Sequence, residues 1–244
     1  VFMQQERPSL RESLQAAMRN RPFVFGLIIF LLTWVAVEIL QATLLFFVKY
    51  VVQREAQNDL VMATIFVTAV FALPIWEFVS RHWSKRWAYA GGIAFWAVVQ
   101  IAMITLGPTT RLSTILVMCV LAGIGVSAAH VLPWAIIPDA IEWGEWQTGE
   151  RHEGMFYSLV TLVRKATTSL AVPAVGLILQ FTGYVPNAAQ QPPSALLGIR
   201  VVIGPIPAAL LCMGILFAIL YPLGREEYAH IARELERRRA AQSD

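Results

Sequence analysis

Six long apolar runs occupy most of this sequence and restrict what it can fold into. As an α-helix, each run is long enough to cross the roughly 30 Å apolar core of a membrane. The runs cover approximately residues 22–52, 60–80, 87–106, 112–137, 154–182 and 200–223. Only 14% of the 244 residues are charged, whereas a soluble domain carries about 25%. We therefore expect an all-α membrane protein with six transmembrane helices.

Polar segments flank this predicted six-helix bundle of residues 22–223. Residues 1–21 hold a capping-box pattern at positions 9–12, so we expect a linker helix along the cytoplasmic membrane surface. Residues 224–244 form a charged cytoplasmic tail, for which a solvated surface helix is favoured over a partner-binding helix. One apolar stripe runs along this tail: Tyr228, Ile231 and Leu235.

The distribution of Lys and Arg predicts the orientation. Most of these residues lie beside the two termini and in the connection at residues 81–86, and few lie on the opposite side. By the positive-inside rule, both termini are cytoplasmic and the protein is a multi-pass protein of the inner membrane. Six spans with both ends inside correspond to one half of a twelve-helix transporter. Because the chain begins with Val1 rather than Met, we expect an N-terminal six-helix half upstream; a six-helix scaffold that transports nothing is the alternative.

No motif in the sequence argues for catalysis. The spacings of a P-loop, a zinc protease helix and a nucleophile elbow are absent. The four histidines are scattered and both cysteines lie in apolar runs, so no metal site or disulfide framework is expected. The net charge of +3 is concentrated beside membrane segments, which indicates topology rather than nucleic-acid binding. We predict neither an enzyme nor a nucleic-acid-binding protein.

Two adjacent cations lie inside the predicted span 154–182. Arg164 and Lys165 are about ten residues into it, which places them roughly 15 Å deep in the membrane. A charge at that depth costs several kcal/mol unless it faces a polar cavity or a partner. Successive residues of a helix point about 100° apart. We therefore expect Lys165 to face a substrate cavity, and Arg164 to pair with carboxylates of the preceding connection or to extend to the interface.

Four other polar residues lie within the predicted spans: Glu38, Gln41, His130 and Thr161. Glu38 and Gln41 are three residues apart and therefore share a helix face. His130 lies roughly 10 Å above the inner end of its helix, at a depth similar to that of Lys165. Two interpretations remain open. These residues line a polar substrate cavity, or they form buried hydrogen bonds that hold helices together.

The connection before the fifth span is acidic and rich in tryptophan. We expect the fourth helix to stop at Pro138 and a charged loop of residues 139–153 to follow. Ion pairs between this loop and the cations of residues 81–86 would close the inner side, and breaking them would open it. The residues of this predicted inner gate are Asp139, Glu142, Glu145, Arg151, Arg81 and Arg164. A solvated anionic face with interfacial tryptophans is the alternative.

The same connection carries a resemblance to a known family. The run PDAIEWGEWQTGERHEGMFYS at residues 138–158 closely resembles the motif that joins helices ten and eleven of the glycoside–pentoside–hexuronide:cation symporters. These are melibiose permease-like members of the major facilitator superfamily. FVKYVV at residues 47–52 and TGYVPNAAQ at residues 182–190 resemble two further segments of their C-terminal half. The resemblance implies symport of a glycoside or related sugar with Na⁺ or H⁺ by alternating access.

By position, the resemblance implies that Lys165 lies beside the cation and sugar sites and that Thr161 lies near the sugar. His130 stands where melibiose permease has a sugar-contacting tryptophan, and Val160 where it has glutamine, which argues against melibiose itself. LPWAIIPD at residues 132–139 resembles the sodium-dependent lysophospholipid symporter, so a lysolipid or other amphiphile is the alternative substrate. The candidate substrate-binding residues are Lys165, His130, Thr161, Gln41, Glu38 and Trp134.

The resemblance also sets the expected partners. The cation-binding aspartates of the family lie in its N-terminal half, so this chain holds no assignable cation site. No cofactor is expected beyond the coupling ion, Na⁺ or H⁺. The expected partners are a small-molecule substrate, membrane lipid and the N-terminal half of the same transporter.

Overall fold

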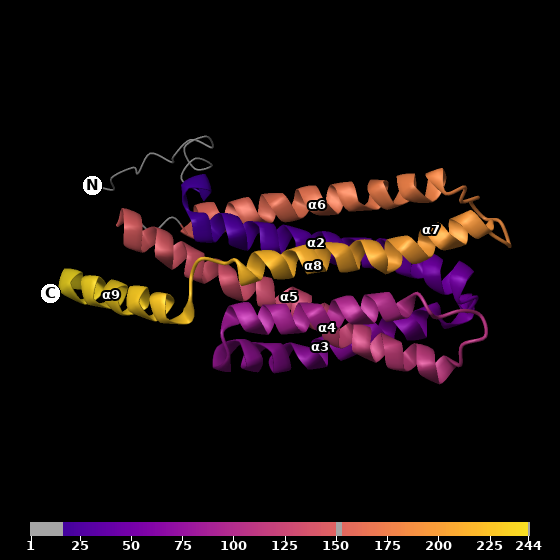
Figure 1. The fold of residues 1–244 in the computed structure, drawn as a ribbon, viewed down its shortest axis with the longest axis horizontal. Helices are drawn as coiled ribbons and strands as arrows, with labels where there is room; N and C mark the ends of the chain where they lie inside the picture. Colours follow the sequence, from indigo (N-terminus) through magenta and orange to yellow (C-terminus); the bar gives the residue numbers. More distant parts are fainter. Residues whose placement is uncertain (1–16, 150–152, 244) are drawn as a thin grey trace.

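The computed structural model describes residues 17–149 and 153–243, and within them the regular structure is helical (Figure 1). The elements are α2 (Arg21–Phe46), a π-helical turn (Phe47–Val51), a 3₁₀ turn (Glu55–Gln57), α3 (Asn58–His82), α4 (Lys85–Met103), α5 (Leu112–Thr148), α6 (Glu153–Phe181), α7 (Pro193–Ile203), α8 (Pro205–Ile219) and α9 (Arg225–Ser243). The long helices lie side by side, and α9 projects from one end of the bundle (Figure 1). The predicted all-α class is confirmed. Residues 1–16 of the predicted linker helix lie outside the described residues.

Five helical segments of the described chain are long and apolar enough to cross a membrane. They are Arg21–Val51, Glu55–His82, Leu112–Thr148, Glu153–Phe181 and Pro193–Ile219. The remaining predicted span, residues 87–106, corresponds to α4, which has 19 residues and begins with Lys85 and Arg86. These two cations shorten its apolar part. α4 still packs within the bundle, mainly against α5 and α8.

The clearest difference from the sequence prediction is the length of α5. The helix does not stop at Pro138 but continues to Thr148, and Gly149, with φ 75°, ends it. A proline removes one backbone donor, which a helix tolerates where other groups satisfy the freed carbonyls. Beyond the proline, the side-chain amide of Asn20 donates to the carbonyl oxygen of Ala140 at 2.8 Å and ties this part of α5 to the start of α2. Residues 139–148 are therefore helical and not a loop.

The last span also begins earlier than predicted. α7 starts at Pro193, inside the segment expected to be an outer connection, and a break at Gly204 separates α7 from α8. Pro205 opens α8 at the first helical position, where its missing N–H has no partner to lose. The two short helices together make one apolar span.

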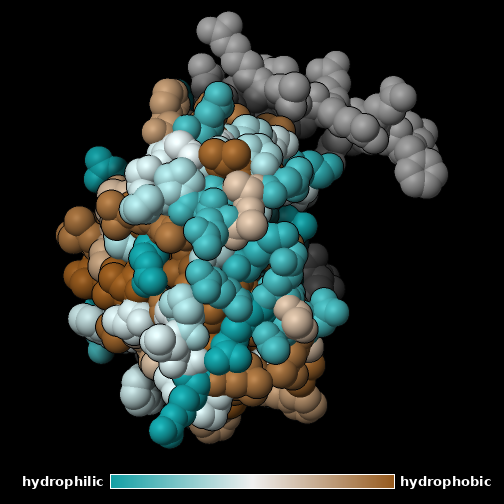
Figure 2. Space-filling view, turned by 90° about the vertical axis from the view of Figure 1, so that its right-hand side faces the viewer, coloured by the Kyte–Doolittle hydropathy of each residue, from teal (hydrophilic) through white to brown (hydrophobic). Residues whose placement is uncertain are grey.

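Two hydrophobic cores hold the bundle together. The larger joins all the helices from α2 to α9, and the smaller joins α2, α5 and α6. In the smaller core, the rings of Phe23 and Phe156 meet edge to face, with centroids 4.5 Å apart. Figure 2 views the end of the bundle opposite α9, where hydrophilic side chains gather over the middle and hydrophobic ones lie along one side. This pattern fits polar connections above an apolar belt.

Candidate functional site

Polar and aromatic residues of α2, α5 and α6 meet around Trp34. This side chain of α2 is 9% exposed. The Trp34 ring lies edge to face with His130 of α5, with ring centroids 5.2 Å apart. Arg164 of α6 places its guanidinium carbon 5.0 Å from the centroid of the same ring, a cation–π contact. We call Trp34, Glu38, His130, Arg164 and Thr168 the Trp34 cluster.

Glu38 connects two helices within this cluster. Its Oε1 accepts a hydrogen bond from Trp34 Nε1 at 3.0 Å and another from the Thr168 hydroxyl of α6 at 2.7 Å. Carboxylates inside a membrane are tolerated when donors or cations compensate them. The two donors therefore satisfy part of this carboxylate and join α2 to α6. Neither Trp34 nor Thr168 was predicted from the sequence, although the spacing of four residues between Trp34 and Glu38 indicates that they can meet on one helix face.

One ring nitrogen of His130 donates a hydrogen bond, and the other has no hydrogen-bond partner among the described residues. His130 Nδ1 lies 2.8 Å from the carbonyl oxygen of Val126, one turn earlier in α5. Since a carbonyl only accepts, Nδ1 carries the proton. In the neutral ring Nε2 is then an acceptor, available to a hydroxyl of a bound molecule.

An aromatic row continues from the cluster toward the α9 end. Phe30 stacks on Trp34, with centroids 5.4 Å apart, and meets Trp134 edge to face at 5.0 Å. Trp134 in turn lies parallel to Tyr157 of α6, at 6.5 Å. The predicted residue Trp134 is thus joined to the Trp34 cluster through Phe30. Aromatic walls with a few placed polar groups are typical of small-molecule sites.

Lys165 lies on a different face of α6 from Arg164, as the 100° rotation between neighbours predicts. It lines an open hollow of about 410 Å³ together with Tyr157, Ser158, Thr161 and Leu162. The Thr161 hydroxyl donates to the carbonyl oxygen of Tyr157 at 2.8 Å, which leaves its lone pairs free. No hydrogen bond or ion pair joins the Lys165 amine to another described residue. The hollow therefore presents a cation and hydroxyl oxygens on one exposed helix face.

Gln41 is separated from the cluster despite its spacing to Glu38. It borders a narrow apolar recess between α2, α3 and α5, together with Met62, Ile65 and Val126. Glu38 instead reaches α6. Although Glu38 and Gln41 share a helix face, Glu38 therefore contacts α6 and Gln41 lies toward α3 and α5.

Most of the predicted gate residues that the structure describes lie at the α9 end of the bundle. Lys85 Nζ of α4 lies 2.6 Å from Asp139 Oδ1 of α5, so the expected ion pair between the two segments is present. Arg81 instead pairs with Glu77 of its own helix, at 2.6 Å. Arg164 lies in the Trp34 cluster instead of against these carboxylates. Arg151 lies outside the described residues.

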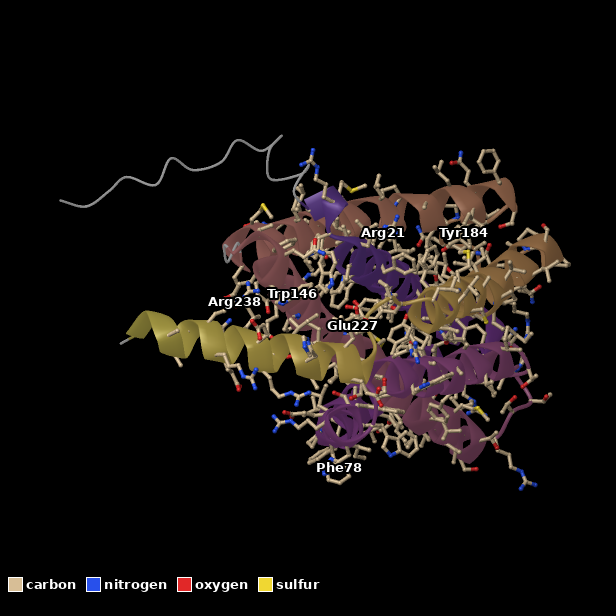
Figure 3. The ribbon with its side chains drawn as sticks, turned by 60° about the vertical axis from the view of Figure 1, so that its left-hand side comes forward. Arg21, Phe78, Trp146, Tyr184, Glu227 and Arg238 are labelled. Atoms are coloured by element: carbon tan, nitrogen blue, oxygen red, sulfur yellow. The ribbon has the colours of Figure 1, made fainter. Side chains whose placement is uncertain are left out.

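The other two gate carboxylates are bound by α9. Tyr228 donates its hydroxyl to Glu142 Oε2 at 2.8 Å, and Arg239 Nη2 lies 2.8 Å from Glu145 Oε2. Arg238 donates to the carbonyl oxygen of Trp146 at 3.2 Å, and Figure 3 shows these two residues where α9 runs past the end of α5. Burial and the hydrogen bond to Glu142 raise the pKa of Tyr228, so its hydroxyl remains a donor.

This docking corrects the favoured interpretation of the tail as a solvated helix. Ile231 and Leu235 are only 2% and 3% exposed and belong to the main hydrophobic core. The apolar stripe was visible in the sequence, but its partner, the extension of α5, was hidden by the predicted stop at Pro138. Among residues 17–149 and 153–243, no group of three or more His, Cys, Asp or Glu side chains could hold a metal ion.

The chain is similar over most of its length to membrane transporters. The family model described as MFS/sugar transport protein matches residues 2–225. An uncharacterized symporter of Synechocystis sp. is 31% identical over 239 residues, covering 96% of this chain and 44% of that protein. The sodium-dependent lysophosphatidylcholine symporter 1-A of Danio rerio is 26% identical, over 95% of this chain and 44% of its own length.

A third relative, from Salmonella typhimurium, is provisionally named a sulfoquinovose importer. It is 31% identical over 242 residues, which cover 96% of this chain and 49% of that protein. The chain thus spans about half the length of the curated relatives it matches.

Proposed function

The chain belongs to the MFS/sugar transport protein family, as its connecting motif predicted, and from this premise we propose that the complete protein is a cation-coupled symporter of a glycoside or related sugar. Na⁺ or H⁺ is the coupling ion, and its site lies mainly in the other half of the transporter. Relatives twice as long and named as symporters support this assignment.

The observation that carries the proposal is the convergence of α2, α5 and α6 around Trp34. A sugar presents hydroxyl groups at its rim and C–H groups on its ring faces. Trp134 and Tyr157 offer aromatic surfaces to those faces, and His130 Nε2 offers an acceptor to a hydroxyl. The open hollow on α6 adds the Thr161 oxygen and the Lys165 amine.

Lys165 is the residue we assign to coupling. Its charge lacks a partner among the described residues, and a membrane-buried cation needs one. Carboxylates or bound substrate facing it from the N-terminal half would supply the compensation. Binding of the coupling ion would then change the electrostatic potential at Lys165, and with it the affinity of the site for the sugar.

The inner gate is assigned to the ion pair between Lys85 and Asp139. The pair joins the start of α4 to the buried beginning of the α5 extension, at 2.6 Å. Opening the bundle at this end requires its separation. Glu142 and Glu145, held by α9, would move with it as one unit.

Uptake into proteoliposomes holding the complete protein tests this function. Labelled glycosides, including sulfoquinovose, are offered to the wild-type protein under an imposed Na⁺ or H⁺ gradient. The same assay is run on Lys165→Ala and on a control variant, Lys49→Ala, which removes a cation at the membrane surface opposite to α9. We expect gradient-driven uptake that Lys165→Ala abolishes and Lys49→Ala preserves. Normal coupled uptake by Lys165→Ala would remove Lys165 from the coupling machinery, and uptake indifferent to both gradients would refute symport.

A specific observation favours a lysolipid as second candidate substrate. A cavity of about 390 Å³ lies between α2, α6, α7 and α8 and is lined almost entirely by apolar side chains, among them Leu31, Val35, Leu170 and Ile206. Its chemistry suits an acyl chain, and Arg164 would meet the phosphate. Inhibition of transport by lysophosphatidylcholine but by no sugar would favour this substrate.

A further inference from the structure

A second polar cavity lies away from the Trp34 cluster, where the α3–α4 turn meets α5 and the start of α9. Its volume is about 180 Å³. Its lining includes Arg81, Lys85, Arg86, Ser84, Tyr221 and Asp139. Three cations, two of them consecutive, therefore border one small cavity.

The carboxylates nearby neutralise only part of this charge. Asp139 lies 2.6 Å from Lys85, and Glu77 lies 2.6 Å from Arg81. Arg86 forms no ion pair with a described residue; its guanidinium carbon lies 5.4 Å from the centroid of the Trp87 ring. The cavity consequently keeps one uncompensated positive charge, on Arg86.

Buried donors at the cavity lack acceptors. Tyr221 is 7% exposed, and its hydroxyl has no hydrogen-bond partner among the described residues. Arg86 Nε is likewise buried without a partner there. Leaving a buried donor unsatisfied costs about 1–3 kcal/mol, so such groups normally have an acceptor. Burial also raises the pKa of Tyr221, which keeps its hydroxyl protonated as a donor.

The backbone adds further donors of the same kind. α4 begins at this cavity, and its N-cap residue Ser84 makes no capping hydrogen bond with its side chain. The first N–H groups of a helix have no partner within the helix and carry partial positive charge. Together with the hydroxyls of Ser84 and Tyr221, they border the same cavity as the Arg86 guanidinium.

Exposed tryptophans place the cavity at a membrane surface. Trp83 and Trp87 flank it and are 66% and 53% exposed. Tryptophans are enriched at the level of lipid headgroups, where basic pockets between helices bind anionic headgroups.

We propose that this cavity binds a phosphate group, held by Arg86, Tyr221 and the first turn of α4, and that an anionic phospholipid headgroup supplies it. The phosphate oxygens accept from the Tyr221 hydroxyl, from the Arg86 guanidinium and from the free N–H groups. Lys85 stays paired with Asp139 at the cavity wall. The inference stands independently of the transported substrate.

Native mass spectrometry of the complete protein in detergent tests the proposal by titration with phosphatidylglycerol. Phosphatidylcholine with the same acyl chains is the headgroup control. Arg86→Gln removes the uncompensated charge, and Tyr221→Phe removes one hydroxyl while keeping the ring. Arg237→Gln, on the exposed face of α9, removes a like charge outside the cavity.

We expect phosphatidylglycerol to bind about tenfold more tightly than phosphatidylcholine, because the choline cation beside the phosphate of phosphatidylcholine is repelled by the uncompensated charge of Arg86. Arg86→Gln should weaken binding about tenfold and Tyr221→Phe several-fold, with Arg237→Gln unchanged. Arg86→Gln and Tyr221→Phe could instead weaken the binding of inorganic phosphate and leave the binding of phosphatidylglycerol unchanged. The anion site would then stand, and its ligand would be free phosphate instead of a lipid headgroup. Binding that neither cavity variant alters, or equal binding of both lipids, would overturn the proposal.

Discussion

At the scale of single residues, the Trp34 cluster shows how a carboxylate is held inside an apolar span. Glu38 accepts from a tryptophan of its own helix and from a threonine of α6, and Arg164 lies over the same tryptophan ring. Each of these contacts involves a charged side chain or a side-chain group that forms hydrogen bonds. The arrangement joins two helices whose remaining contacts are mostly apolar.

Thr168→Val tests the bond between these helices. Valine keeps the shape of threonine but removes the hydroxyl that donates to Glu38, so we expect a loss of about 1.5–3 kcal/mol, the usual range for a hydrogen bond to a charged group. Thermal unfolding of the detergent-purified protein measures it. Ser169→Ala is the matched control, because within the described part of the chain the Ser169 hydroxyl bonds to the carbonyl of Lys165 in its own helix and to no other helix. Equal melting temperatures for the two variants would contradict an energetic role for the Thr168 contact.

At the scale of helices, small residues allow α4 and α5 to pack closely. A Cβ added at Gly125 of α5 would collide with the ring of Trp96 of α4, which is fully buried. Gly91, in α4, has no atom within 4 Å of an added Cβ. The same substitution therefore has opposite consequences at the two positions.

Gly125→Ala should destabilise the protein and Gly91→Ala should not. Overpacking a filled core costs about 1–3 kcal/mol, whereas alanine at an open helical position gains up to about 1 kcal/mol over glycine. Thermal unfolding in detergent provides the comparison. A destabilisation of the same size at both positions would show that helix propensity, and not the contact with Trp96, decides the effect.

The tail helix α9 depends on apolar contacts more than on its ion pair. Leu235 is buried against the α5 extension, while the Arg239 side chain is half exposed. Truncating a buried leucine costs about 2–5 kcal/mol, and an exposed ion pair contributes about 0–1 kcal/mol. Leu235→Ala should therefore release α9 and accelerate tryptic cleavage in the tail, and Arg239→Gln should change it little. Faster cleavage with Arg239→Gln than with Leu235→Ala would reverse this assignment.

At the scale of the whole molecule, the candidate site has walls on one side only. α6 presents Lys165 and Thr161 on an exposed face, and the family relatives are about twice as long as this chain. Transporter sites of this kind lie between two repeats near the membrane midplane. The second repeat would supply the opposite wall.

We expect the 244 residues alone to give no gradient-driven uptake in proteoliposomes. Co-expression with the proposed N-terminal half should restore it, because the site then regains its second wall. Phosphatidylglycerol binding to the cavity at α9 should be retained in the isolated chain, since all its assigned residues belong to this half. Coupled uptake by the isolated chain would contradict a site shared between two halves.

Some expectations followed from local chemistry and were reliable. The rotation between Arg164 and Lys165 depends only on helix geometry, and the two side chains lie on different faces of α6. The stop predicted at Pro138 was wrong, because proline removes only one backbone hydrogen bond and contacts with distant residues such as Asn20 stabilise the helix beyond it. No local pattern reports such a partner.

The sequence by itself determined that this is an α-helical membrane protein of a transporter family, because apolar length and the connecting motif are properties of continuous segments. Only the tertiary structure decided which polar residues meet. Glu38 and Thr168 are separated by 130 positions, and Tyr228 and Glu142 by 86. Their contacts arise from the packing of whole helices, to which each residue contributes little. The intrinsic preferences of a segment therefore define its helix, and only the competition among all helix faces for burial defines its neighbours.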